Sequence, residues 1–281
     1  MSLARLTDLL QPAAADGTGV GAFNVFSIEH AEAHVAGAEQ AGLPVVLQIS
    51  QNAVRYHRGL EPIALATLSI ARSAAVPVVV HLDHADDQEL VDQAIALGFG
   101  SVMYDGSKLD YDANVAATAD VVLRCHRAGI DAEAELGEVG GKDGVHAPGA
   151  RTEPQEARQF VEATGVDALA VAVGSSHAMT SRTAVLDLAL IAELKAAVPV
   201  PLVLHGSSGV PDDEIVRAVR AGMTKINIAT HLNVVFTGTV RDLLGDDPKL
   251  VDSRKYLGPA RDAVAAEVAR LLGMLHGAPV D

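Results

Sequence analysis

Short hydrophobic runs alternate with longer stretches of helical period along the whole chain. Runs such as residues 76–84, VPVVVHLDH, are rich in β-branched side chains and predict buried strands. Stretches between them, such as 28–42 and 87–98, have the spacing of amphipathic helices and end in glycine, as helices often do. The predicted strands lie within residues 19–25, 43–50, 76–84, 99–107, 129–137, 166–177, 200–209 and 223–230.

This alternation predicts a parallel sheet, and eight strand–helix units in 281 residues favour a closed (β/α)8 barrel. The alternative is a doubly wound open sheet, which normally has a G-x-G-x-x-G turn after its first strand, and this chain lacks one. We therefore predict an α/β fold, a (β/α)8 TIM barrel in a single domain over residues 1–281. Residues 254–275 are expected to form an additional C-terminal helix.

Composition limits the possible partners and compartment. The formal net charge of -15 and the lack of any Lys/Arg-rich run argue against a nucleic-acid partner. No apolar run is long enough to span a membrane, and the N-terminal residues do not resemble a signal peptide. The single cysteine, Cys125, excludes an intramolecular disulfide and is expected to be buried on a helix. We expect a cytoplasmic protein that binds no membrane.

Polar or titratable residues stand where each predicted strand ends. In barrels of this kind the active site forms at the carboxyl ends of the strands. The residues at this rim are Asn24, Ser50, Asp83, His84, Asp105, Ser107, Glu133, Glu135, His177, His205 and Asn227. Their convergence predicts that the chemistry is located there.

Three of the rim residues are histidines, His84, His177 and His205. Three histidine ligands with a fourth position open to water or substrate describe a catalytic zinc site. His81 shares the side of the strand that carries Asp83 and is expected to support the site from one layer deeper. The histidines on predicted helices are expected to be solvated; these are His30, His34, His126 and His276.

Asp83 and His84 are neighbours, so a regular strand would point them to opposite faces. Because the chain turns at the strand end, both side chains can reach the rim, where Asp83 can work as a base. A helix N-cap or a partner of a ligand is the alternative role for Asp83. Asp86 and Asp87 are interpreted as first-turn acids of the next helix.

Two stretches are typical of phosphate-binding turns. HGSSG, residues 205–209, offers backbone N–H groups and small hydroxyls before a helix predicted near Pro211. NIATH, residues 227–231, ends a strand and opens a helix. Helix N-termini bind anions, and a phosphate site after strands seven and eight is common in this fold. An ordinary Ser/Gly turn is the alternative.

Taken in order, these motifs resemble the class II, metal-dependent ketose-bisphosphate aldolases, which include the fructose- and tagatose-1,6-bisphosphate aldolases. The likeness runs almost end to end, through GAFNV, HLDH, SVMYDGS, EAELGEVGG, VDALAVAVGSSH, LVLHGSSGVP, KINIAT and SRKYLGPARDAV. The resemblance implies reversible cleavage of a ketose 1,6-bisphosphate to dihydroxyacetone phosphate and an aldehyde such as glyceraldehyde 3-phosphate. It also implies a homodimer or homotetramer, a Zn²⁺ cofactor, and a monovalent cation such as Na⁺ or K⁺ as a further candidate.

The resemblance also assigns roles to residues. His84, His177 and His205 match the zinc ligands, and Glu135 matches a carboxylate that can bind the metal in an alternative position. Asp83 matches the general acid/base. The pocket for dihydroxyacetone phosphate is matched by Gly174, Gly206, Ser208, Asn227 and Thr230, with Asn24 and Ser50 as further candidates. Arg254 matches an arginine that reaches the distal phosphate from the neighbouring subunit.

The chain departs from the family in a loop that usually carries a second acid, a glutamate in a Gly-Gly-x-Glu-Asp pattern. Here the loop reads GGKDGVHAPG, one residue shorter, with Lys142 or Asp143 near the expected glutamate. We expect Asp143 to substitute, with His146 as the second candidate. Ala178 and His231 also differ from the usual family residues, which leaves open another phosphorylated or sulfonated ketose as the substrate.

Other mechanisms remain open from the residues alone. Lys225 shares the inward side of its strand with Asn227 and could form a Schiff base if its amine were neutral. A zinc-dependent hydrolase on the same barrel is a second possibility. A sugar-phosphate-binding regulatory homologue that has lost activity is a third.

Overall fold

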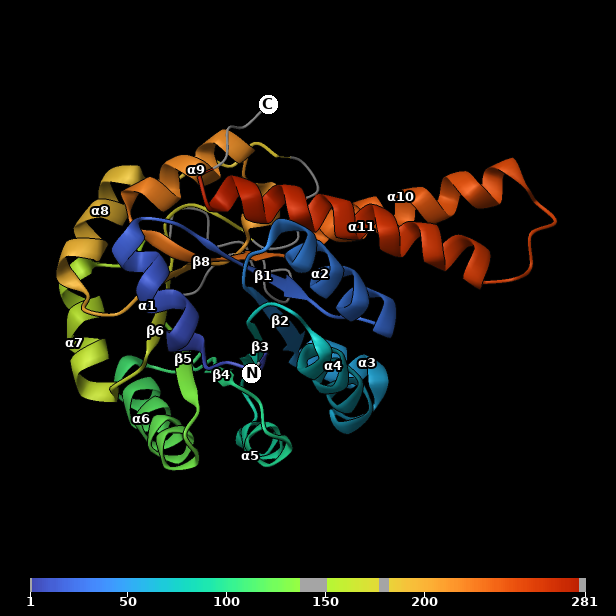
Figure 1. The fold of residues 1–281 in the computed structure, drawn as a ribbon. Helices are drawn as coiled ribbons and strands as arrows, with labels where there is room; N and C mark the ends of the chain where they lie inside the picture. The colour runs from blue at the N-terminus through green and yellow to red at the C-terminus, as the bar shows by residue number, and fades with distance from the viewer. Residues whose placement is uncertain (1, 137–150, 177–181, 278–281) are drawn as a thin grey trace.

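The computed structural model describes residues 2–136, 151–176 and 182–277. Eight parallel strands close into a barrel in chain order, each paired with the next and the last with the first (Figure 1). They are β1 (Val20–Asn24), β2 (Val45–Ser50), β3 (Val78–Ala85), β4 (Ser101–Tyr104), β5 (Asp131–Leu136), β6 (Ala168–Val171), β7 (Leu202–Leu204) and β8 (Met223–Ile228). The predicted (β/α)8 barrel is confirmed. The organisation of residues 1–281 as one domain stays a prediction.

Helices cover the barrel from outside, most of them around its sides and the first at its amino-terminal end. They are α1 (Leu6–Asp16), α2 (Ile28–Ala41), α3 (Gln51–His57), α4 (Glu61–Ser73), α5 (Gln88–Leu97), α6 (Tyr111–Ala128), α7 (Pro154–Thr164), α8 (Leu188–Ala197), α9 (Asp212–Ala221), α10 (Thr230–Asp246) and α11 (Arg254–Leu275). The last of these has the bounds expected from the sequence. Among the described residues, no helix combines the length and the apolar character needed to cross a membrane.

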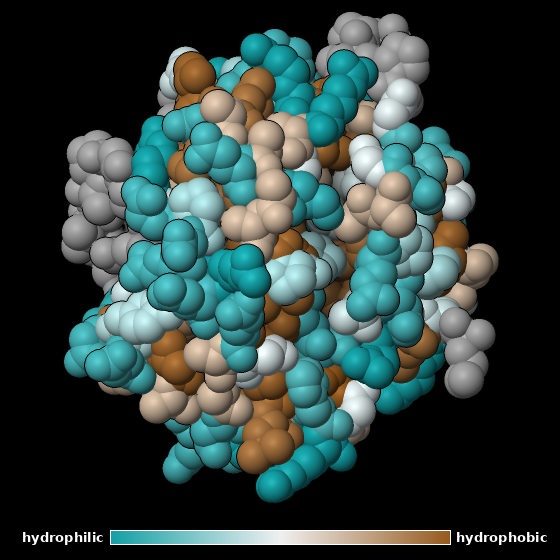
Figure 2. All heavy atoms as spheres, turned by 90° about the vertical axis from the view of Figure 1, so that its left-hand side faces the viewer, coloured by the Kyte–Doolittle hydropathy of each residue, from teal (hydrophilic) through white to brown (hydrophobic). Residues whose placement is uncertain are grey.

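The strands are buried along their length, as their continuous hydrophobic runs predict. Figure 2 shows one outer face of the molecule, where hydrophilic residues are spread with hydrophobic ones between them. This mixture is expected from amphipathic helices that turn one side to the barrel. Cys125 on α6 is fully buried, as predicted, and burial raises the pKa of its thiol to about 12.

The amino-terminal end of the barrel is closed by α1. Leu6 and Leu10 of this helix are buried and pack with small residues of the barrel interior. Buried Asp131 of β5 holds the start of α1, because it accepts hydrogen bonds from the amide and hydroxyl of Thr7 and from the guanidinium of Arg5. Because α1 covers the amino-terminal end, the active site is expected at the carboxyl end of the barrel, where the candidate site residues lie.

The expectation that His30 and His34 are solvated is wrong. Helix α2 packs against both the barrel and α11, so it is covered on two sides. The two helices approach so closely that a Cβ at Gly37 would clash with the carbonyl of Ala265. His34 is fully buried with Nε2 3.0 Å from the carbonyl of Asn24, and His30 stacks on Phe236. His126 and His276 are exposed, as expected.

Burial lowers the pKa of His34 to about 3. The folded protein therefore excludes a proton that an unfolded histidine binds below its ordinary pKa of 6.5. The stabilisation that His34 provides is complete above pH 6.5 and is lost as the pH falls from 6.5 toward 3. By pH 5 this loss is expected to reach about 2 kcal/mol.

His34→Gln keeps a donor for the Asn24 carbonyl but cannot titrate. The free energy of urea unfolding should decrease less between pH 7 and pH 5 in this variant than in the unaltered protein. His276→Gln, at an exposed site, should behave like the unaltered protein. Equal losses for His34→Gln and the unaltered protein would refute this assignment.

Candidate active site

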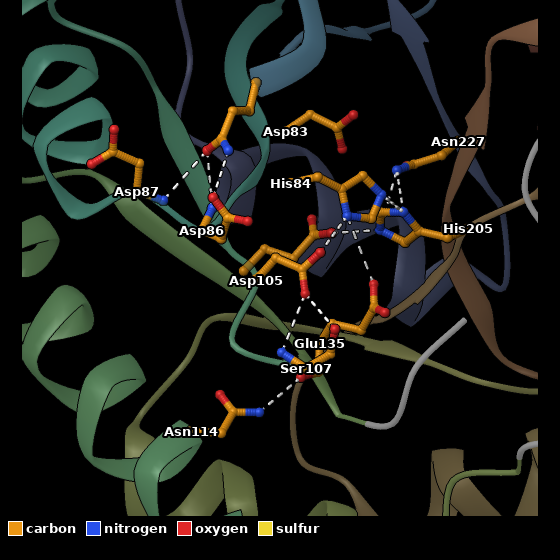
Figure 3. A network of polar contacts seen from close by, with 12 residues as sticks. Asp83, His84, Asp86, Asp87, Asp105, Ser107, Asn114, Glu135, His205 and Asn227 are labelled. Atoms are coloured by element: carbon orange, nitrogen blue, oxygen red, sulfur yellow. Dashed lines mark hydrogen bonds and ion pairs between the residues drawn. The ribbon is translucent and has the colours of Figure 1, made fainter. Parts of the chain in front are cut away.

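The end of β3 presents two neighbouring side chains to the same site. His84 has φ of 48°, a left-handed conformation that residues other than glycine seldom adopt. The pairing of β3 with β4 is irregular between Leu82 and Ala85, where β3 has one more residue than its partner. This bulge turns His84 inward beside Asp83, as expected from the chain turning at the strand end (Figure 3).

His84 and His205 face each other across the carboxyl end of the barrel, with His84 Nε2 2.8 Å from His205 Nδ1. The far nitrogen of each ring contacts a carboxylate. His84 Nδ1 lies 2.9 Å from Asp105, and His205 Nε2 lies 3.0 Å from Glu133. A carboxylate fixes the ring hydrogen on the nitrogen that it contacts, so the two facing nitrogens are left with lone pairs. Asn227 Nδ2 lies 3.2 Å from His205 Nδ1, and a shared proton or a metal ion contacted by both rings would offset the repulsion between the facing lone pairs.

Glu133 connects His205 to a buried charge in the barrel interior. Its second oxygen accepts a hydrogen bond from Lys225 Nζ at 2.8 Å, and the side chains of both residues are fully buried. The same oxygen lies 3.8 Å from His81 Nε2. His81 is also fully buried and contacts Ser101, so it supports the site from a deeper layer, as expected. Burial, with the nearby charge of Lys225, keeps the pKa of His81 well below its usual value, so this histidine is neutral.

Asp83 is almost completely buried, and Asn24 donates a hydrogen bond of 3.1 Å to its Oδ2. Burial acts to raise the pKa of Asp83, but the nearby His84, His205 and Lys225 and the Asn24 hydrogen bond outweigh it. The pKa is therefore lowered, and the carboxylate is ionised at neutral pH. An ionised, buried carboxylate at the end of a strand is suited to accept a proton from a ligand.

The residues present fit a divalent metal ion. One group of ligand atoms within 4.8 Å of one another comes from Asp83, His84 and His205, and a second comes from His84, Asp105 and Glu135. Asp83 Oδ1 and Asn227 Oδ1 are buried and have no hydrogen-bond partner among the described residues. Buried polar atoms of this kind are usually satisfied, so these two oxygens indicate a ligand.

The turns proposed to hold phosphate lie at the same end of the barrel. Gly206 and Gly174 have φ of 69° and 116°, and a Cβ at either position would clash with a neighbouring backbone. The Ser208 hydroxyl accepts hydrogen bonds from the amides of Ala229 and His231, at the start of α10. Thr230 is the first residue of α10, and α9 begins at Asp212, one residue after Pro211. Both helices therefore begin at this end.

Several expected residues have other positions or lie outside the described part of the chain. Ser50 caps α3, because its hydroxyl accepts a hydrogen bond from the Ala53 amide. Asp86 and Asp87 precede α5 rather than forming its first turn, and Asp87 is its N-cap. Arg254 begins α11 and is exposed and paired with Asp252. Outside the described residues lie His177, Asp143, His146, Lys142 and Ala178.

A parallel eight-stranded barrel with a histidine and carboxylate cluster at its carboxyl end is typical of a metal-dependent barrel enzyme. Residues 4–278 match the family model described as fructose-bisphosphate aldolase class-II. The chain therefore belongs to the class-II fructose-bisphosphate aldolase family, and it is a metal-dependent aldolase. The resemblance seen in the sequence is confirmed.

Individual relatives agree with this placement. The fructose-bisphosphate aldolase of Thermus caldophilus is 40% identical over an alignment of 284 positions that covers 92% of each chain. That of Geobacillus stearothermophilus is 39% identical over 95% of each chain. Among solved structures, the YdjI aldolase from Escherichia coli K12 superposes with a TM-score of 0.86 at 32% identity, over 98% of each chain.

The structure adds residues to which the sequence assigned no role. Asp105 and Glu133 were recognised as rim residues, and each contacts a metal-type histidine. Gln48 and Gln51 were missed altogether. Gln48 is fully buried on β2 and donates to Asn24 Oδ1 at 3.1 Å. Gln48 could have been recognised from the sequence, because a glutamine within the run VVLQIS is unusual in a buried strand.

Proposed function

We propose that this protein is a zinc-dependent class II aldolase that reversibly cleaves a ketose 1,6-bisphosphate, of the fructose or tagatose type. The products are dihydroxyacetone phosphate and an aldehyde such as glyceraldehyde 3-phosphate. The main support is the pair of facing nitrogens of His84 and His205, each ring oriented by a carboxylate and placed beside Asp83. The family, and the names of relatives such as the fructose-bisphosphate aldolase of Thermus caldophilus, support the substrate class.

In this proposal His84 and His205 hold the metal ion together with His177, and Glu135 offers a further ligand. Glu135 Oε2 lies 3.9 Å from His84 Nδ1 and belongs to the second group of ligand atoms, with His84 and Asp105. The bound ion would supply a Lewis acid, which stabilises the negative charge that develops on the dihydroxyacetone phosphate half during cleavage. We propose Zn²⁺ because the facing ligands are imidazoles, and a monovalent cation such as Na⁺ or K⁺ is a further candidate.

Asp83 is proposed as the base that removes the hydroxyl proton when the carbon–carbon bond breaks. Its lowered pKa keeps it ionised, and Asn24 holds one oxygen while the other is available to the substrate. Asp143 or His146 is proposed to move the second proton, at the carbon of the enediolate. Neither lies within the described residues.

The phosphate of the dihydroxyacetone half is proposed to bind at the turns after β6, β7 and β8. At Gly174 and Gly206 the chain approaches neighbouring backbone so closely that no side chain fits, so both turns require glycine. Ser208, Asn227 and Thr230 offer polar groups at the start of α10, where the helix dipole favours negative charge. Asn24 and Ser50, at the ends of the neighbouring strands β1 and β2, remain candidates for contact with the substrate.

Arg254 is proposed to contact the distal phosphate in a neighbouring subunit. Helices α10 and α11 run side by side and extend beyond the barrel as an arm, with the loop 247–253 at its tip (Figure 1). Arg254 stands at this tip, away from the barrel of its own chain, with 88% of its side chain exposed. An arginine in this position suits a homodimer or homotetramer. A cytoplasmic location is part of the same proposal.

The Schiff-base alternative is disfavoured by the surroundings of Lys225. Its ammonium is fully buried against the Glu133 carboxylate, and an ammonium held in an ion pair is not the neutral amine that attacks a carbonyl. The zinc hydrolase has no specific observation in its favour. Cleavage of a different ketose remains the second candidate function. His231 differs from the usual family residue, and its ring contacts Glu267 of α11 at 2.6 Å.

The proposal is tested by an assay for release of dihydroxyacetone phosphate from fructose and tagatose 1,6-bisphosphates. We expect release that a chelator abolishes and that added Zn²⁺ restores, and the ratio of the two rates defines the preference at C4. The lysine mechanism would be supported instead if a chelator left the release unchanged and borohydride trapped a covalent adduct of substrate and protein. One zinc per chain without release from either substrate would favour another ketose or the regulatory homologue.

A further inference from the structure

The left-handed conformation of His84 needs an explanation, because strained backbone persists only where the surroundings hold it. The conformation has a clear consequence. Without it, His84 and Asp83 would point to opposite sides of β3, and only one of them could face the mouth of the barrel. Whatever holds this turn therefore allows a metal ligand and a base to come from successive residues.

The turn is held on one side by β4. The Asp105 amide donates to the carbonyl of Ala85 at 2.8 Å, and the Asp105 carboxylate contacts the His84 ring. On the other side, the pairing of β2 with β3 is regular as far as Ser50 opposite Asp83, where the ladder ends. The backbone of β2 therefore cannot support the residues that follow Asp83.

The side chain of Gln51 continues where this ladder ends. Gln51 is the first residue of α3 and is 7% exposed. Its Oε1 accepts hydrogen bonds from the amides of Asp86 at 3.1 Å and Asp87 at 3.3 Å, and its Nε2 donates to the Asp86 carboxylate. One amide group thus makes three contacts with the two residues that follow the bulge.

We infer that Gln51 is a positioning residue of the metal site. It acts through the backbone of residues 84–87, where it holds the turn that presents His84 beside Asp83. The contacts require an acceptor for two amides and a donor for one carboxylate, which a glutamine provides and an apolar residue of the same shape does not. This inference rests on the proposed metal site and extends it to a residue that touches neither metal nor substrate.

The test measures binding of Zn²⁺ alone, by competition with a chromophoric chelator, and the visible spectrum of the Co²⁺-loaded protein. Gln51→Met keeps the length of the side chain and removes all three contacts. We expect its Zn²⁺ affinity to fall ~10–100-fold, the range found when groups that orient metal ligands are removed. The Co²⁺ spectrum should change as well, because the orientation of a ligand changes.

A matched pair of variants separates positioning from packing. Gln51→Glu keeps the acceptor for the two amides but sets a second carboxylate against Asp86, so it should also weaken Zn²⁺ binding. Adding Asp86→Asn supplies the missing donor from the other side, and Q51E/D86N should regain affinity to within a few-fold of the unaltered protein. Asn52→Ala, at the neighbouring exposed position, should have no effect.

The outcomes differ for each idea. If the unaltered protein binds no Zn²⁺, the proposed metal site is wrong. If it binds Zn²⁺ and Gln51→Met binds equally well, the metal site stands and the role of Gln51 is refuted. The role of Gln51 is also refuted if Q51E/D86N binds Zn²⁺ no more tightly than Gln51→Glu. This comparison tests the role of Gln51 even if Gln51→Met does not fold.

Discussion

Asp83→Asn is expected to lower kcat for aldol cleavage ~10²–10⁴-fold, the usual contribution of a positioned general base. Asparagine has the shape of aspartate and can still contact Asn24, so the substitution mainly removes the ability to accept a proton. The low pKa of Asp83 means that almost every molecule carries this base in its active form at neutral pH. Nothing in the substitution disturbs the contact between His84 and His205.

The measurement pairs turnover with metal content. Asp83→Asn should retain one bound metal ion per chain, with KM little changed, while kcat falls. Asp87→Asn is the matched control, because Asp87 lies four residues further along the chain, is more exposed and keeps a capping oxygen as asparagine. If Asp83→Asn loses the metal ion, Asp83 is a ligand, which its distance from the two histidines permits. Unchanged turnover would remove Asp83 from the mechanism.

The neighbours Asp83 and His84 show how much of the site the sequence could predict. A residue at the end of each strand could be assigned to one rim because parallel strands in a barrel all end on the same side. The conclusion that both neighbours reach the rim was correct. The means could not be predicted, because a histidine in left-handed backbone has no local sequence signal. It depends on Gln51 and Asp105, which belong to two other strand–helix units.

The same limit explains the error at α2. The spacing of its apolar residues predicted an amphipathic helix, and His30 and His34 were expected to be solvated on it. The second buried face is produced by α11, more than two hundred residues further along the chain. Helix bounds follow from local pattern, and α11 was predicted to the residue. The neighbour against which a helix packs does not follow from that pattern.

The contact between Glu133 and Lys225 could be suggested by the alternation of residues along the strands, but it could not be established from that alternation. Lys225 was expected to face inward by its spacing from Asn227, and Glu133 was expected at the rim where its strand ends. Only the closed barrel shows that one carboxylate contacts both Lys225 and His205. The lysine considered as a nucleophile therefore has a different role, as the countercharge of the carboxylate that orients a metal ligand.

Glu133→Gln is accordingly expected to destabilise the metal-free protein by ~3–5 kcal/mol, because it leaves the ammonium of Lys225 buried without its partner. It should also lower Zn²⁺ affinity ~10–100-fold, because His205 loses the charge that orients its ring. Urea unfolding of the chelated protein measures the first effect, and chelator competition measures the second.

The double variant E133Q/K225M separates the two effects. Removing both charges replaces a buried ion pair with neutral groups, which is often close to neutral for stability, so most of the lost unfolding free energy should return. Zn²⁺ affinity should stay low, because the carboxylate opposite His205 Nε2 is still absent. If stability and affinity recover together, the loss of affinity in Glu133→Gln came from a disturbed fold. If affinity alone remains low, Glu133 controls the metal site through His205, and Lys225 serves to keep that carboxylate in the barrel.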